Sequence, residues 1–325
     1  MIDFSSKNIR MWSRLGMCGT YGIILTELRR QQNEFVACTA DLCFYSGLER
    51  FEREFPDDLY NVGIAEQNLI GVAGGLVKEE IDVFASTYAS FATTRALDQV
   101  RVNMGYMQLP IKLIGLTSGF AVGILGPTHM CIEDVAIMRA IPNITIISPA
   151  DTTEFAKILC ALVDYKKPVY VRLTGTMNCP IIYKQDYEYR IGKAITLKEG
   201  KDIAIVSSGV IVSTCLKVAN ALQEHNISAA VIDMHTIKPL DMDCLKKLNQ
   251  YKLVVSVEEH SIYGGLGATL AEYFAQIKEK TQLKIIGVED EYPHAGEYEY
   301  VMKEYGLDAD SITNKILKEW QERRI

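Results

Sequence analysis

The 325-residue sequence lacks several features that mark membrane, metal-binding and nucleic-acid-binding proteins. No run of about 18 apolar residues occurs, so no membrane span is expected, and the first residues lack the apolar core of a secretory signal. The eight cysteines form no CxxC pair or metal-ligand cluster, which favours free thiols in a reducing cytoplasm over disulfides or zinc. Acidic residues outnumber basic ones, 41 to 34, so neither nucleic acid nor a membrane surface is expected as the main partner.

The sequence does contain an alternation of short β-rich runs and amphipathic helices, which indicates parallel α/β sheets. The length is enough for two domains of ordinary size. We therefore expect two three-layer α/β sandwich domains with mostly parallel sheets. The predicted strands are Phe35–Thr39, Val83–Ala85, Ile111–Thr117, Ile144–Ile147 and Val169–Leu173, and then Ile203–Ser207, Ala229–Asp233, Leu253–Val257 and Lys284–Val288.

The boundary between the domains is expected in a polar, tyrosine-rich stretch, Tyr183–Arg190. Before it, Asp151 can cap a helix, with Glu154 three residues later as in a capping box. We predict a first domain over residues 1–182, a linker over 183–192 and a second domain over 193–325. The predicted helices of the second domain are Ser213–Glu224, Leu266–Ile277 and a last one that begins at Ser311.

The most informative stretch is residues 60–76, YNVGIAEQNLIGVAGGL, in which Glu66 opens an apolar-periodic helix. A glutamate in a first helical turn is favoured by the helix dipole, which would make it a structural residue. A carboxylate held in a mostly apolar setting can instead be a proton-handling group. Both interpretations of Glu66 stay open from the residues alone.

Three further patterns accompany predicted strands of the first domain. Tyr88 and Phe91 are aromatics three residues apart, which can clamp a flat heteroaromatic ring or simply pack in the core. His129 ends a rigid Gly-Pro turn after strand Ile111–Thr117, at the kind of strand end where α/β proteins place ligands. Arg172 lies inside a β-rich run and needs an anionic partner if buried, either a substrate or a structural carboxylate.

In the second domain, a strand, a glycine loop and a helix follow one another at Glu258–Gly267. Such a loop can cradle an anion at the helix N-terminus. It can also form a tight turn that allows close packing. The loop therefore marks a second candidate site without assigning a ligand to it.

The order and spacing of these motifs are more specific than any one of them. The run from Asp41 through GIAEQN, STYASF, GPTH, PAD and YVRL resembles the pyrimidine-binding domain of the transketolase family. The second half, with DMHTIKPL at 233–240 and EEHSIYGGLG at 258–267, is similar to the family's C-terminal domain. The resemblance implies a thiamine diphosphate-dependent transferase that moves a two-carbon ketol unit from a ketose donor to an aldose acceptor.

The resemblance also implies roles for individual residues. Glu66 would hydrogen-bond a pyrimidine nitrogen of the cofactor, and His129 would hydrogen-bond substrate hydroxyls, which makes these two the implied catalytic residues. The implied cofactor-binding residues are Asp41, Ile64, Glu66, Tyr88 and Phe91, and the implied substrate-binding residues are His129 and Arg172.

A full transketolase begins with a diphosphate-binding domain that carries a Gly-Asp-Gly sequence, and this sequence contains none. The chain therefore resembles the C-terminal half of a split transketolase. The resemblance implies an N-terminal partner subunit that holds the diphosphate and a Mg²⁺ or Ca²⁺ ion. It also implies an active site between the chains and an α2β2 assembly, with no metal ligand on this chain.

Several positions depart from the family pattern where substrate is bound. Leu125 and Met130 stand where the family usually has an aspartate and a glutamine beside the histidine. Positions that usually bind the sugar phosphate align with Cys18, Tyr45 and Thr117. Since a phosphate dianion normally needs several donors, we expect an unusual substrate: a deoxy, amino, sulfo or nucleotide-linked sugar.

Three alternatives remain at this point. Two keep the cofactor: the β subunit of a 2-oxo acid dehydrogenase decarboxylating component, and an enzyme like 1-deoxyxylulose-5-phosphate synthase. The third is a catalytically silent regulatory subunit, which the presence of Glu66, Tyr88, Phe91 and His129 argues against.

Overall fold

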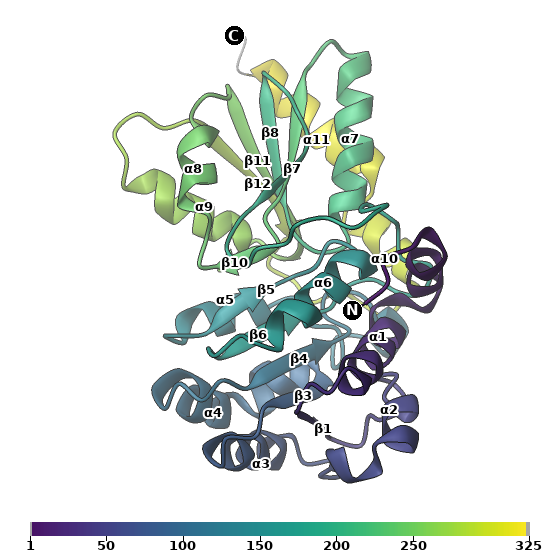
Figure 1. Ribbon diagram of the computed structural model, residues 1–325. Helices are drawn as coiled ribbons and strands as arrows, with labels where there is room; N and C mark the ends of the chain where they lie inside the picture. The colour runs from purple at the N-terminus through teal and green to yellow at the C-terminus, as the bar shows by residue number, and fades with distance from the viewer. Residues whose placement is uncertain (1, 323–325) are drawn as a thin grey trace.

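The computed structural model describes residues 2–322, which form two β-sheets covered by helices (Figure 1). From edge to edge, the first sheet contains β10 (Thr236–Lys238), β5 (Thr145–Ile147), β6 (Val169–Arg172), β4 (Lys112–Leu116), β3 (Val83–Tyr88), β1 (Val36–Thr39) and β2 (Leu59–Asn61). The second contains β12 (Gln282–Val288), β11 (Leu253–Ser261), β8 (Ile203–Ser207), β9 (Ala229–Asp233) and β7 (Ile195–Lys198). Among these strands, only β10 and β7, each at a sheet edge, run antiparallel to their neighbours.

Helices cover both faces of the first sheet. One buried cluster joins α1 (Ser6–Arg30), α2 (Glu49–Glu54) and α6 (Thr152–Leu162) to the sheet. A second cluster lies on the opposite face and joins α3 (Glu66–Lys78), α4 (Leu97–Val100), α5 (Asp134–Ala140) and the wide-turn segments η2 (Phe91–Arg95) and η3 (Arg101–Tyr106) to it. The short turns η1 (Pro56–Asp58) and η4 (Gly123–Leu125) complete the domain.

The second sheet is covered in the same way. Helices α7 (Val212–Glu224), α10 (Tyr298–Glu304) and α11 (Ala309–Glu322) pack with one face, and α8 (Met242–Leu248) and α9 (Leu266–Ala275) pack with the other (Figure 1). The predicted class of two three-layer α/β sandwiches is therefore confirmed. Within residues 2–322, no helix combines the length and apolar character that a membrane span requires.

The nine predicted strands and the predicted helices are all present, with ends that differ by a few residues. The longest helix, α1, has no counterpart in the prediction. No side chain caps its first turn, and Gly16 interrupts its helical backbone at a φ of 71°. A Cβ at Gly16 would lie 2.9 Å from the Thr176 carbonyl oxygen, so glycine permits both the bend and the close packing there.

The tyrosine-rich stretch between the domains is packed rather than fully solvated. Tyr183 is buried, stacks on Tyr187 at 4.3 Å between ring centroids and donates its hydroxyl to Asp233 at 2.7 Å. Asp151 caps α6 as predicted, accepting from the Glu154 amide at 2.8 Å, and it also accepts from the Tyr183 amide. The helix cap therefore fixes the path of the chain into the second domain.

One strand from the second half of the sequence belongs to the sheet of the first domain. Strand β10 comes from the second half of the sequence but pairs with β5 at the edge of the first sheet. The predicted boundaries at residues 182 and 193 stay predictions, because the chain returns to the first sheet after leaving it. One consequence is that the domains share a hydrogen-bonded edge, which fixes their relative orientation.

Candidate active site

The candidate site lies at the carboxyl edge of the first sheet, where β1, β3 and β4 end. Asp41 follows β1 with a φ of 58°, and Thr117 follows β4 with a φ of 53°. A β-branched residue at positive φ is rare, because its side chain crowds the backbone. Such conformations gather at functional sites, where the surrounding structure holds them in place. The edge is also where parallel α/β sheets bind ligands.

Glu66 begins α3, as the sequence predicts, and its side chain is 4% exposed. Its Oε1 accepts a hydrogen bond from Arg95 Nη1 at 2.8 Å. The helix dipole favours a carboxylate in this first turn. The apolar residues Leu69 and Ala73 of the same helix are buried in the core and hold α3 against the sheet. Glu66 is therefore a nearly buried carboxylate fixed at the end of a rigid element.

Three of the predicted side chains form an aromatic cluster. Tyr88 ends β3, and its ring centroid lies 5.8 Å from that of Phe91 and 5.7 Å from that of His129. Phe91 and His129 are 5.3 Å apart, and all three pairs meet edge to face. Burial, and then the nearby Tyr45 and Cys18, raise the pKa of Tyr88, so its hydroxyl remains a hydrogen-bond donor at neutral pH.

Arg95 belongs to this site, although the sequence analysis did not single it out. Its guanidinium carbon lies 3.9 Å from the centroid of the Phe91 ring while its Nη1 reaches Glu66. Both Phe91 and Arg95 lie in the π-helical segment η2, and such wide turns are frequent at functional sites. One planar group therefore spans the gap between the carboxylate and the aromatic ring.

Asp41 and Ile64 lie at the rim of this site rather than inside it. Both are exposed, Ile64 to 78%. Asn61, another residue that the sequence analysis missed, accepts from the backbone amides of Asp41 and Gly63 at 3.0 Å each. Its amide side chain at the end of β2 was the available signal, since asparagine often bonds nearby backbone in turns.

The loops at this edge carry large apolar side chains that are exposed. They are Phe44 and Tyr45 after β1, Ile64 after β2, Ile124 and Leu125 after β4, and Met177 after β6. We call these residues the apolar rim. Exposed apolar groups that gather near a site mark a surface for a ligand or for another protein chain.

The structure gives Arg172 a structural carboxylate instead of a free position for substrate. Its side chain is 3% exposed, its Nε lies 2.9 Å from Asp134 Oδ2, and its Nη2 donates to the Glu259 carbonyl oxygen at 2.6 Å. Burial lowers the pKa of the Arg172 guanidinium, but Asp134 and Glu259 raise it more, so the net shift is upward. Two of its three nitrogens, Nε and Nη2, therefore donate to protein groups, and the substrate role of Arg172 stays a prediction that these contacts do not favour.

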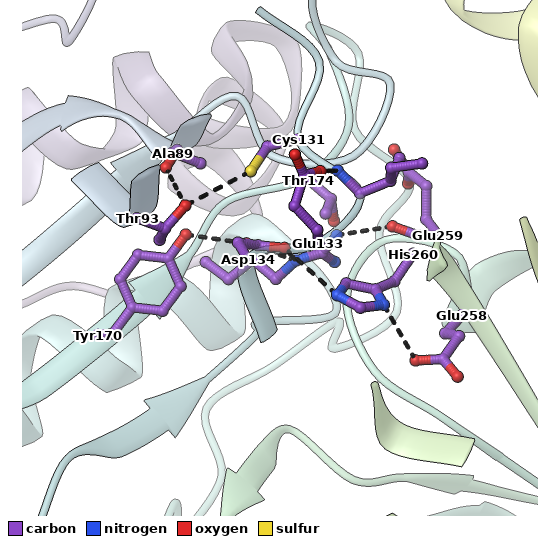
Figure 2. Close-up of polar contacts among 12 residues, drawn as sticks. Ala89, Thr93, Cys131, Glu133, Asp134, Tyr170, Thr174, Glu258, Glu259 and His260 are labelled. Carbon is purple, nitrogen blue, oxygen red and sulfur yellow. Dashed lines mark hydrogen bonds and ion pairs between the residues drawn. The ribbon is translucent and has the colours of Figure 1, made fainter. Parts of the chain in front are cut away.

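Arg172 is part of a buried polar network between the domains. Its partners Asp134 and Glu259 are labelled in Figure 2. Glu259 accepts from the Phe120 amide at 2.7 Å and from the Tyr298 hydroxyl at 2.8 Å. On the other side, Thr93 in η2 donates to the Ala89 carbonyl oxygen and lies 3.7 Å from the Cys131 sulfur. These contacts of Thr93 form a separate, smaller cluster that ties η2 to the Cys131 loop.

The glycine loop of the second domain already holds an anion from this chain. Glu258 accepts from the backbone amides of Leu266 at 2.7 Å and Gly267 at 3.0 Å, at the start of α9. Burial raises the pKa of Glu258 to about 7. A Cβ at Gly265 would lie 2.0 Å from the Glu258 carboxylate, so the loop serves close packing, not a free anion cradle.

The residue set fits one end of thiamine diphosphate. A carboxylate and an aromatic ring, spaced so that one planar nitrogen-bearing group touches both, suit an aminopyrimidine. For the diphosphate and its metal, residues 2–322 contain no group of three or more histidine, cysteine, aspartate or glutamate side chains that could hold an ion.

Comparison with known proteins agrees with this geometry. The transketolase pyrimidine-binding domain model matches residues 15–178, and the transketolase C-terminal domain model matches residues 192–312. One subunit of an apulose-4-phosphate transketolase from Phocaeicola vulgatus is 36% identical, over 90% of this chain and 94% of its own length. A 6-deoxy-6-sulfo-D-fructose transketolase subunit from a Clostridium species is 34% identical, over 90% of this chain and 91% of its own.

A solved structure gives the same result in three dimensions. The inactive β4 tetramer of a split-gene transketolase superposes with a TM-score of 0.82 at 34% identity, over 92% of this chain and 96% of that one. Both domain models and the relatives span nearly the whole chain. This chain therefore belongs to the thiamine diphosphate-dependent transketolase family, as a split-enzyme subunit that carries the pyrimidine-binding and C-terminal domains.

Proposed function

We propose that this subunit, with an N-terminal partner, transfers a two-carbon ketol unit from a ketose donor to an aldose acceptor. The observation that carries the proposal is the spacing of Glu66 and Phe91. Glu66 lies 2.8 Å from one atom of a planar group whose centre lies 3.9 Å from the Phe91 ring. A cofactor ring of similar thickness can take the same two contacts, and a nearly buried carboxylate is otherwise costly to keep.

In this proposal each side chain has a separate task. Glu66 holds a proton at its carboxylate beside a ring nitrogen of the cofactor. Phe91 and Tyr88 stack on or beside the ring and exclude water from the carboxylate. His129, half-buried against both aromatics, offers a ring nitrogen to substrate hydroxyls. When bound, thiamine diphosphate supplies the carbon nucleophile and electron sink for cleaving a bond next to a carbonyl.

Asp41 and Ile64 complete the cofactor-binding set that we propose. Both lie on loops tied together by the Asn61 side chain, at the rim of the aromatic cluster. Their exposure in this subunit suits residues that meet the cofactor between two chains. In this proposal the partner holds the diphosphate and a Mg²⁺ or Ca²⁺ ion, because the Gly-Asp-Gly sequence of the family's diphosphate-binding domain does not occur in this sequence.

We propose an atypical sugar as the substrate. The positions that usually bind the sugar phosphate hold Cys18, Tyr45 and Thr117, which carry no positive charge. Arg172, the one basic residue predicted to bind substrate, uses its Nε and Nη2 on Asp134 and the Glu259 carbonyl oxygen. The relatives named for apulose-4-phosphate and 6-deoxy-6-sulfo-D-fructose support a substrate outside the ordinary pentose phosphates.

We also propose an α2β2 assembly in the cytoplasm. The apolar rim lies beside the cofactor site and offers its surface to the partner. Two copies of each chain form a closed arrangement in which every cofactor-ring site meets a diphosphate site. All eight cysteines are free, which suits a reducing compartment.

The test is transfer by this chain mixed with its N-terminal subunit, thiamine diphosphate and Mg²⁺, over a panel of phosphorylated and unphosphorylated ketoses. Glu66→Ala should lower kcat by about 100-fold or more, because a proton-transfer group contributes that much. The matched control is Glu79→Ala, an exposed carboxylate at the opposite end of α3. It should leave the rate unchanged.

Three results would contradict the proposal. Release of CO₂ from pyruvate or another 2-oxo acid at a higher rate than ketol transfer would favour one of the two cofactor-sharing alternatives. Turnover that is equal in Glu66→Ala and wild type would favour a silent regulatory subunit. Ordinary pentose phosphate kinetics would overturn the atypical substrate while leaving the reaction type intact.

A further inference from the structure

Arg95 occupies the centre of the cofactor-ring site in this structure. Its Nη1 donates to Glu66 Oε1 at 2.8 Å, and its guanidinium carbon lies 3.9 Å from the Phe91 ring centroid. The Arg95 backbone carbonyl oxygen also accepts from Gln67 Nε2 at 3.1 Å. The residue is therefore held next to the start of α3 by two neighbouring side chains, and one planar group takes both functional contacts.

A guanidinium and an aminopyrimidine share the features that these contacts recognise. Each is planar, carries N–H donors in its plane and stacks on aromatic faces. A ring that stacks on Phe91 and forms a hydrogen bond with Glu66 therefore needs the same two contacts that Arg95 makes in this structure. The two groups compete wherever they use the same face of Phe91 and the same carboxylate oxygen.

The exposure of the two partners shows which one can move. The Arg95 side chain is 47% exposed, whereas that of Glu66 is 4% exposed. Water can take over the hydrogen bonds of the guanidinium when it swings outward, and the incoming ring takes its place on the Glu66 carboxylate. Glu66 is fixed in the first turn of α3 and cannot follow.

The ion pair is also incompatible with the proton handling proposed for Glu66. A carboxylate that accepts from a guanidinium is ionised and has no proton to donate. To share a proton with a ring nitrogen, the carboxylate must be released from Arg95 or exchange its partner. Cofactor binding and the loss of the Arg95–Glu66 bond are then one event.

We propose that Arg95 is a displaceable plug of the cofactor-ring site. In the subunit without cofactor, its guanidinium satisfies the nearly buried carboxylate and covers the Phe91 ring. Binding of the cofactor ring displaces the guanidinium toward solvent and transfers both contacts to the ring. This inference rests on the proposed function, because it requires Glu66 and Phe91 to bind the cofactor.

The experiment measures thiamine diphosphate binding by equilibrium dialysis with Mg²⁺, on the assembled complex of both subunits, without substrate. Arg95→Ala should bind the cofactor about fivefold to thirtyfold more tightly, since a half-exposed ion pair and a cation–π contact no longer compete. Arg95→Lys keeps the charge but not the planar stack, so its affinity should lie between those of Arg95→Ala and the wild type.

The matched control is Arg101→Ala. Arg101 is another exposed arginine, and it pairs with Asp98, three residues before it in the sequence. This variant should leave cofactor affinity unchanged. Arg95→Ala with equal or weaker affinity than the wild type would overturn the plug, and weaker affinity would make Arg95 a lasting support of the ring. If the wild-type complex binds no cofactor at all, the proposed function fails and the plug fails with it.

Discussion

The active-site edge and the domain interface hold their carboxylates in opposite ways. At the edge, Glu66 is nearly buried but its partner Arg95 is 47% exposed. At the interface, Asp134 and Arg172 are both buried, at 0% and 3% exposure. In the first pair the solvated arginine can leave if another group takes its place on Glu66, whereas in the second pair neither member can reach water.

The polarity of the surroundings also differs between the two regions. The active-site edge is bordered by the exposed apolar rim, while the interface buries a polar network around Asp134 and Glu259 (Figure 2). Exposed apolar residues at the edge are expected if another protein chain covers them. The polar network then orients the two domains, and the edge remains free to rearrange when cofactor and partner bind.

The largest effect should come from breaking the buried pair. Asp134→Ala leaves the Arg172 guanidinium buried without its carboxylate and removes the acceptor of the Tyr170 hydroxyl. Unfolding by urea, followed by circular dichroism, should show a loss of about 3–5 kcal/mol in the free energy of unfolding. The matched control, Asp98→Ala, breaks an exposed pair with Arg101 and should cause no measurable loss.

Equal losses in Asp134→Ala and Asp98→Ala would remove the basis of the comparison. They would mean that water reaches the interface pair as easily as the surface pair. A large loss in Asp134→Ala alone would show that the network contributes to stability only while every member is paired.

The second prediction concerns pH and Glu259. Burial raises the pKa of Glu259 to about 7 in the folded chain, above the ordinary value of 4.5. Between these two values the folded state binds more protons than the unfolded one, so stability falls as pH rises. The contribution is fully present below pH 4.5 and is lost as pH rises through about 7, and its upper limit is about 3 kcal/mol.

Glu259→Gln isolates this contribution, because glutamine does not titrate, can accept from the Phe120 amide with its oxygen and can donate from its amide nitrogen to the Tyr298 hydroxyl. The wild type should lose stability relative to the variant as pH rises from 5 to 8, a difference that urea titrations at each pH measure. The comparison with a variant is needed because burial also lowers the pKa of His260 to about 4, which acts in the opposite direction at low pH. A pH-independent difference would contradict the prediction.

Much of the fold follows from local sequence patterns. The strands at Ile203–Ser207 and Ala229–Asp233 have the predicted bounds, since short β-rich runs between helical segments are strong signals. The cap of α6 follows from Asp151 and Glu154, which act within one turn. The grouping of Tyr88, Phe91 and His129 also follows from sequence, because each follows a strand that ends at the same edge.

What sequence could not show depends on contacts between distant segments. Strand β10 pairs with β5 across the domain boundary, which no local pattern encodes. The choice for Arg172 between substrate and structural carboxylate needed the position of Asp134, 38 residues away. Arg95 reaches both Glu66 and Phe91 from the π-helical segment η2, and such a wide turn has no signature in composition.

The smallest of the three effects concerns the apolar rim, and it tests whether the active-site edge meets another protein chain. Ile64 is 78% exposed in this subunit, so Ile64→Asp should not destabilise the isolated chain. If the rim meets the partner subunit, the buried carboxylate would weaken association by about 2 kcal/mol, or about 30-fold in Kd. Titration of the labelled N-terminal subunit, followed by fluorescence anisotropy, measures this change.

The matched control is Met242→Asp, which places the same charge on an apolar residue that is 51% exposed at the start of α8, in the second domain. A helix N-terminus tolerates an aspartate, so the control should leave both stability and association unchanged. Equal weakening by the two variants would point to charge repulsion over the whole chain instead of contact at the rim. Weakening by Ile64→Asp alone would locate the partner at the active-site edge, beside the carboxylate that Arg95 now covers.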